Sequence, residues 1–191
     1  MRVFCIDGLG SSSGISFIQM QLKESCFNYQ EGYASLSLDA GVFRPDSIVA
    51  RDFSVLIATM QLNDHQGEKT LRWLDLMSGC GIRALRWGLE SVLPLTDNKI
   101  LSSGLEIWVN DADFDRFNLL RSNLEPVFRK KIPLRLNCEL AEVFLAKAYL
   151  EKCFFDLIDL DCFGSPNYLL QPLMRILSFD GILMLSSSDG R

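Results

Sequence analysis

The stretch that decides the fold is Leu71-Arg72-Trp73-Leu74-Asp75-Leu76-Met77-Ser78-Gly79-Cys80-Gly81-Ile82-Arg83. In it, an apolar strand pattern runs directly into a glycine turn and then a helix. Gly79 and Gly81 permit a tight turn and a close backbone approach to a ligand. The helix that follows presents free N–H groups. In an open α/β sheet, ligands bind outside the carboxyl ends of the strands. The stretch therefore predicts a ligand-binding loop at the first strand of such a sheet.

The chain from residue 71 onward alternates apolar strand patterns with amphipathic helical patterns. This alternation is typical of a mostly parallel sheet with helices on both faces, and it predicts an α/β, Rossmann-like fold. The predicted strands are Leu71–Met77, Leu105–Asp111, Ile132–Leu136, Phe154–Leu160 and Gly181–Ser186. The predicted helix Asp113–Leu124 carries apolar residues at intervals of three and four, so we expect them in the core: Phe114, Phe117, Leu120 and Leu124.

The length of 191 residues, with 48% hydrophobic content, suits one principal core. We expect residues 1–45 to form an N-terminal extension with short strands. Residues 46–191 would form the main domain, beginning with a helix from Ser47 to Met60 and truncated after its fifth strand. No apolar run approaches the ~20 residues of a membrane helix, so we expect no membrane association.

The six cysteines form no Cys-x-x-Cys pair and no zinc-like cluster. We therefore expect no metal site, and reduced thiols in an intracellular compartment. The net charge of -5 is unfavourable for binding a polyanion, because phosphate contacts need clustered Lys and Arg. The densest basic run is Arg129–Lys131 together with Arg135, which is either a local nucleic-acid patch or a solvated helix end.

The glycine loop fits two cofactors. Its residues Gly79–Ala84 match the dinucleotide pattern with Ala in the third place, which keeps an NAD-dependent oxidoreductase open. Asp75, four residues before the first glycine, favours S-adenosyl-L-methionine, because enzymes that use it place a carboxylate there near its methionine end. Asp111 would accept hydrogen bonds from ribose hydroxyls of either cofactor. Glu139, after the third strand, is a candidate for the adenine amine.

The second informative stretch runs from Phe155 to Pro166, where an apolar strand ends in an acid, an aromatic residue and a Gly-Ser-Pro turn. Asp161-Cys162-Phe163-Gly164 resembles the Asp/Asn-Pro-Pro-aromatic motif of enzymes that methylate exocyclic amines. Such a site must hold the amine with an acceptor and clamp the base plane by stacking. Asp161 can accept a hydrogen bond from the amine, and Phe163 can stack on the base. Asp159 should point the same way along the pleat and is the alternative acid.

With these blocks in order, the chain resembles the catalytic domain of the tRNA (guanine-26-N2) dimethyltransferase family. The resemblance implies a class I S-adenosylmethionine-dependent methyltransferase fold. It also implies cofactor contacts from Arg51, Arg83 and Asp111, with Asp161 as the catalytic acid. The matching blocks are Glu31-Gly32, Val42-Phe43, Ala50–Val55, Leu74–Arg86, Asn110-Asp111, Ile158–Pro166 and Ser188-Asp189.

The chain departs from that family at defined positions. Cys162 replaces the proline after the acid, and Arg44 replaces the aromatic residue after Phe43. We expect the chain to lack the family's C-terminal RNA-binding domain. Two hypotheses therefore stay open: a tRNA guanine-N2 methyltransferase acting at position 26, and a catalytically inactive binding or regulatory module. For the enzyme, tRNA is the expected partner, held weakly without a C-terminal domain.

Overall fold

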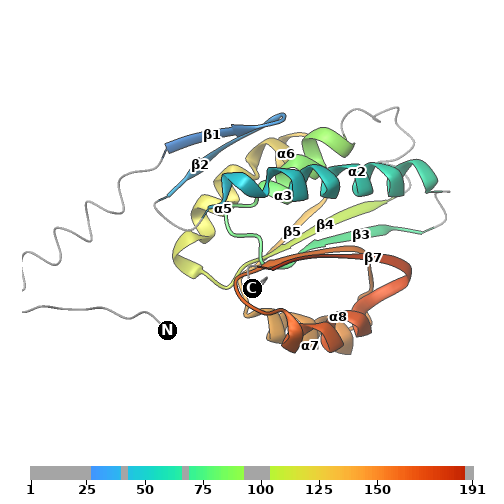
Figure 1. Ribbon diagram of the computed structural model, residues 1–191. Helices are drawn as coiled ribbons and strands as arrows, with labels where there is room; N and C mark the ends of the chain where they lie inside the picture. Colours follow the sequence, from blue (N-terminus) through green and yellow to red (C-terminus); the bar gives the residue numbers. More distant parts are fainter. Residues whose placement is uncertain (1–26, 40–42, 66–68, 93–103, 188–191) are drawn as a thin grey trace, which may run out of the picture.

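The computed structural model describes residues 27–39, 43–65, 69–92 and 104–187, and within them five strands form one sheet in which every pair is parallel (Figure 1). The strand order is β5-β4-β3-β6-β7. These strands are β3 (Leu71–Asp75), β4 (Leu105–Asn110), β5 (Leu134–Asn137), β6 (Phe155–Cys162) and β7 (Leu177–Ser187).

Helices cover both faces of this sheet, so the predicted α/β class is confirmed (Figure 1). The helices on one face are α2 (Ile48–Asp64), α3 (Ile82–Arg86) with the π-helical turn η2 (Trp87–Val92), α5 (Phe117–Asn123) and α6 (Glu125–Arg129). The helices on the other face are α7 (Ala141–Leu150) and α8 (Asn167–Ile176). None of the helices in the described ranges is long and apolar enough to span a bilayer.

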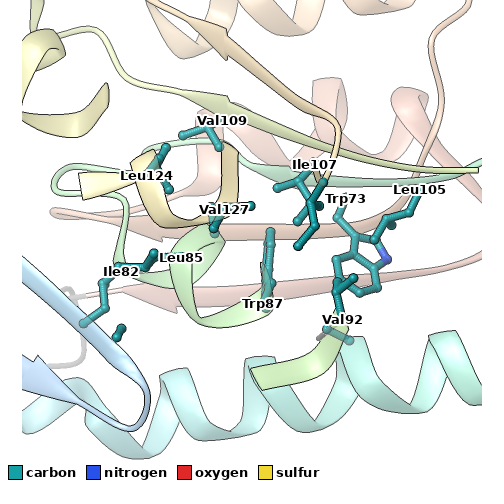
Figure 2. Packing of buried hydrophobic residues seen from close by; sticks show 14 of the residues in the cluster. Trp73, Ile82, Leu85, Trp87, Val92, Leu105, Ile107, Val109, Leu124 and Val127 are labelled. Carbon is teal, nitrogen blue, oxygen red and sulfur yellow. The ribbon is translucent and has the colours of Figure 1, made fainter. Parts of the chain in front are cut away.

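The core has two parts because successive side chains of the central strand β3 point to opposite faces. Trp73 packs into the cluster on the α2 face, and Leu74 packs into the cluster on the α7 face. Figure 2 shows the first cluster, where Trp73 and Trp87 meet edge to face with ring centroids 5.8 Å apart. The indole N–H of Trp73 donates to Gln61 Oε1 at 3.0 Å, which ties α2 to the sheet.

A hairpin precedes α2. Its strands β1 (Phe27–Glu31) and β2 (Ala34–Leu38) are antiparallel and turn at Gly32, whose φ is +55°. Alternate residues of β2 are buried in the cluster of the α2 face: Ala34, Leu36 and Leu38. The hairpin is thus fixed to the cluster on the α2 face by apolar packing, and it brings Glu31 beside Arg51 of α2.

The helix predicted over Asp113–Leu124 is shorter than expected. The carboxylate of Asp113 accepts from the backbone N–H groups of Asp115 and Arg116, which sets a 3-10 turn, η4 (Phe114–Arg116), before α5. Phe114 is therefore 79% exposed, and its prediction as a core residue is wrong, whereas Leu120 and Leu124 are buried as predicted. Strand β7 begins at Leu177, earlier than predicted. The sequence also predicts a loop over Leu95–Gly104, of which all but Gly104 lies outside the described residues.

Candidate cofactor and substrate site

The site lies where the strand order reverses. From β3 the chain continues through β4 and β5 on one side of the sheet, and then returns to β6 on the other side of β3. Asp75 of β3 is paired in register with Asp159 of β6. A crevice at such a switch point, outside the carboxyl ends of the strands, is where open α/β sheets bind ligands.

A cavity of about 90 Å³ lies at this point. It brings together six of the nine site residues predicted from the sequence: Arg51, Asp75, Gly79, Arg83, Asp161 and Phe163. Its other lining residues, none of them among the predicted site residues, are Phe43, Arg44, Met77, Ser78, Cys80 and Ile82. Gly81, Asp111 and Glu139 do not line it.

The two glycines of the loop have different surroundings, although both have positive φ. A Cβ added at Gly79 would meet no atom within 4 Å, so this backbone faces open space. A Cβ added at Gly81 would lie 2.6 Å from Leu120 Cδ1, so Gly81 serves the packing of the turn against α5. The N–H of Gly79 donates to Asp111 Oδ2 at 2.7 Å, which fixes Asp111 beside the loop.

Ser78 carries an unsatisfied hydroxyl. Its Oγ is buried without a hydrogen-bond partner, while its N–H donates to the carbonyl of Asn110 at 3.0 Å. Buried polar atoms nearly always have a partner, so an orphan that lines a cavity indicates a ligand contact. The only signal in the sequence was its position immediately before Gly79. The free hydroxyl, the open backbone at Gly79 and the nearby carboxylates fit a polar ligand with several donors.

Asp75 is buried at the end of β3, with 2% of its surface exposed. Burial, reinforced by the negative charge of Asp159, raises the pKa of Asp75 to about 8. Its Oδ2 accepts a long hydrogen bond, 3.4 Å, from the backbone N–H of Ala84. The structure gives this acid little compensation for its burial, which is typical of residues that meet a ligand.

Arg83 joins both candidate acids of β6. Its Nε lies 2.8 Å from Asp159 Oδ1 and its Nη2 lies 2.9 Å from Asp161 Oδ2. The predicted alignment of the two acids along the pleat is thus confirmed, but their exposure differs. Asp159 is buried, and it also accepts from Ser54 Oγ at 2.6 Å. The side chain of Asp161 is 34% exposed and lines the cavity, so of these two acids only Asp161 is open to it.

Arg51 is held by a buried ion cluster that no local sequence pattern indicates. Both oxygens of Glu31 accept from Arg51, and Oε1 also accepts from Arg86 Nη1 at 2.7 Å. The hydroxyl of Tyr29 donates to Glu31 Oε2 at 2.9 Å. The guanidinium of Arg51 lies 5.1 Å from the ring centroid of Phe43. The hairpin therefore fixes the position of an arginine that lines the cavity.

Phe163 stands at the open side of the cavity, 61% exposed. The guanidinium carbon of Arg44 lies 5.1 Å from the centroid of its ring. Glu139 lies further away: its carboxylate pairs with Lys147, and its backbone N–H donates to Asn110 Oδ1 at 3.2 Å. The contact of Glu139 with an adenine stays a prediction.

Comparisons with known proteins place this site in context. A family model described as N2,N2-dimethylguanosine tRNA methyltransferase matches residues 24–191. The tRNA (guanine(26)-N(2))-dimethyltransferase of Pyrococcus abyssi is 29% identical over 166 residues, which are 80% of this chain and 38% of that protein. The enzyme of the same name from Methanocaldococcus jannaschii is 26% identical over 173 residues, which are 89% of this chain and 43% of that protein. The chain thus spans about two fifths of these relatives.

Solved structures share the fold at low sequence identity. An S-adenosylmethionine-dependent methyltransferase from Agrobacterium tumefaciens superposes with a TM-score of 0.60 at 16% identity, over 83% of this chain and 51% of that chain. The tRNA m1G37 methyltransferase of M. jannaschii gives 0.55 at 11% identity, over 83% and 40%. These likenesses confirm the methyltransferase fold. With the family model covering nearly the whole chain, the chain belongs to the N2,N2-dimethylguanosine tRNA methyltransferase family.

Proposed function

We propose that the cavity at the β3–β6 switch point binds S-adenosyl-L-methionine and that the chain methylates the exocyclic N2 amine of guanine in tRNA. The orphan Ser78 hydroxyl, the open backbone at Gly79 and the buried Asp75 carboxylate support the cofactor part of this proposal. In this arrangement Arg51 pairs with the cofactor carboxylate, Asp75 faces its cationic end and Asp111 accepts from its ribose. When bound, the cofactor supplies an electrophilic methyl group.

The reacting amine of guanine is a weak nucleophile, because its lone pair is delocalised into the ring. The chain must therefore hold it in line and accept its proton. Asp161 does both: its Oδ2 is fixed by Arg83 at 2.9 Å, and it is exposed to the cavity. Phe163, two residues later, supplies an apolar plane on which the base stacks. This arrangement of Asp161, the one acid at the end of β6 that is anchored and still open, is the observation that carries the proposal.

The inactive-module hypothesis rests on the expected lack of a C-terminal domain and on Cys162, which stands where the family has proline. Cys162 is buried, and its Sγ lies 3.6 Å from the carbonyl oxygen of Gly164, within the turn that carries Phe163. A small apolar thiol fills this position without displacing Asp161 or Phe163 from the cavity. No observation favours the inactive module over the enzyme.

The proposed substrate is a tRNA guanine, and the names of the relatives point to position 26. The basic run is a poor anchor for it, since Arg129 pairs with Glu125 and Arg135 pairs with Glu106. Phosphate contacts dominate affinity for nucleic acid. We therefore expect residues 1–191 to bind tRNA weakly.

Two measurements test the proposal. Calorimetric titration should give binding of S-adenosylmethionine and none of NAD. Incorporation of labelled methyl into unmodified tRNA, at high tRNA concentration, should fall by about 10²–10⁴-fold in Asp161→Asn with little change in cofactor affinity. Asp115→Asn, an exposed acid outside the cavity, is the matched control. Binding of NAD in place of S-adenosylmethionine, or full turnover by Asp161→Asn, would refute the proposal.

A further inference from the structure

Arg44 is the one cavity residue whose charged group the proposed function leaves without a role. It lies just before the short 3-10 turn η1 (Pro45–Ser47), in an extended backbone conformation. Its carbonyl accepts from Arg51 Nη1 at 3.0 Å, which ties its backbone to the buried ion cluster. Its guanidinium reaches the cavity and lies over Phe163. The backbone is thus fixed while the side chain extends toward the expected position of the base.

The guanidinium of Arg44 donates no hydrogen bond and forms no ion pair to another residue in the described ranges. Among the ion pairs within the described ranges, the other two arginines of the cavity, Arg51 and Arg83, each have carboxylate partners, and Arg44 has none. Its contact is the face of an exposed aromatic ring. A cation–π contact at an exposed site is weak, so this head group is free to exchange the ring for a better partner.

We infer that Arg44 reads the acceptor edge of the target guanine by donating hydrogen bonds to O6 and N7. This inference rests on the proposed function and deepens it, since it names the group that selects guanine. A guanidinium fork matches these two acceptors, and the pairing is the commonest base-specific contact of arginine. Adenine has an amino donor where guanine has O6, so it cannot accept both hydrogen bonds from the guanidinium. Asp161 would hold the N2 amine at the opposite end of the base.

The present contact with Phe163 explains how the base enters. A guanidinium and a purine cannot occupy the same face of one ring. When guanine stacks on that face, the head group of Arg44 must move to the edge of the base, while its carbonyl stays bonded to Arg51. Arg44 therefore covers Phe163 in the free protein and contacts the base edge in the complex.

The competing role for a free arginine at the mouth of a nucleic-acid site is a phosphate contact. A phosphate contact positions the RNA but carries no information about the base. The two roles separate with an RNA that carries 7-deazaguanosine at the target position. This base lacks the N7 acceptor and keeps O6, the N2 amine and the phosphates.

The experiment measures the dissociation constants of the 191-residue chain for the guanosine and 7-deazaguanosine RNAs, for the parent, Arg44→Ala and Arg44→Lys. The parent should bind the guanosine RNA about tenfold or more tightly than the 7-deaza RNA, as expected for one lost hydrogen bond to a charged donor. Arg44→Ala should bind both RNAs equally. Arg44→Lys, which keeps the charge and loses the fork, should recover little of the difference. Arg121→Ala, an exposed arginine elsewhere, should leave the ratio unchanged.

Equal loss of affinity for both RNAs in Arg44→Ala, rescued by Lys, would identify a phosphate contact and overturn the inference. A parent that does not distinguish the two RNAs would overturn it as well. Methyl incorporation measured in parallel keeps the two proposals separate. A parent with an N7-dependent affinity but no turnover would refute the methyltransferase activity and leave the guanine contact of Arg44 standing.

Discussion

Asp75→Asn should make the protein more stable at alkaline pH and no more stable at acidic pH. The pKa of Asp75 is raised from 3.8 to about 8, first by burial and then by the charge of Asp159. The folded protein therefore keeps a proton that the unfolded chain gives up. The two pKa values differ by about four pH units, and each unit corresponds to about 1.4 kcal/mol. At alkaline pH, burial of Asp75 therefore lowers the unfolding free energy of the parent by at most about 6 kcal/mol.

The direction of this pH dependence follows from the number of protons that the folded and unfolded states bind. Below about pH 4, Asp75 is neutral in both states, so Asn is a close mimic and the difference between the two proteins is constant. Between about pH 4 and pH 8 the folded state holds more protons than the unfolded state, so the unfolding free energy of the parent falls relative to that of the variant. Above about pH 8 the difference levels off. The pH dependence of groups that do not interact with Asp75 cancels in the comparison.

Urea unfolding of both proteins across this pH range measures the difference directly. Ser78→Ala, a change in the same loop that removes no titrating group, is the control, and it should shift stability by the same amount at every pH. If the difference between Asp75→Asn and the parent does not vary with pH, then Asp75 is not protonated in the folded protein, and its role as a buried, uncompensated acid is wrong.

Three other substitutions separate binding from folding. Asp111→Ala should weaken S-adenosylmethionine binding about tenfold or more in calorimetry without unfolding the protein, because it removes one charged acceptor beside Gly79. Glu31→Gln should lower the unfolding free energy by about 3–5 kcal/mol in urea titrations, because it leaves the buried guanidinium of Arg51 without its carboxylate partner, whereas Arg86 keeps Asp52 and Glu90. Gly81→Ala should lower the thermal midpoint, because its Cβ would clash with Leu120 and its φ is +82°; an unchanged midpoint would contradict this packing role.

The parts of the site that could be predicted from sequence are those whose chemistry is written in consecutive residues. The glycine loop after β3 and the acid-aromatic pair at the end of β6 each combine a strand, a turn and a functional residue within a dozen positions. The alternation of strands and helices then brings both ends to one edge of the sheet. This is why residues as distant as Gly79 and Asp161 were expected in one site and line one cavity.

The parts that could not be predicted depend on contacts between distant segments. The cluster around Glu31 joins the hairpin to α2 and α3, and no local pattern shows that a strand residue will meet Arg51 and Arg86. The wrong assignment of Phe114 has a local cause: periodicity placed it on the helix face, but the cap formed by Asp113 delays the helix until Phe117. Hydrogen bonding at the helix start outweighed the apolar pattern.

The burial of the Asp75 carboxylate lowers the unfolding free energy of the protein, and the proposed cofactor explains why an acid lies there. Within the described part of the chain no ion pair holds this carboxylate, and Arg83, whose charge acts on it to lower its pKa, pairs with Asp159 and Asp161. A buried acid without a cationic partner is destabilising unless it is protonated or meets a positive ligand. S-adenosylmethionine carries a positive sulfonium and a positive amine, so its binding favours the ionised form of Asp75. In the proposed complex, a positive group beside Asp75 would offset the energy that its burial costs in the free protein, so this position favours a cationic ligand.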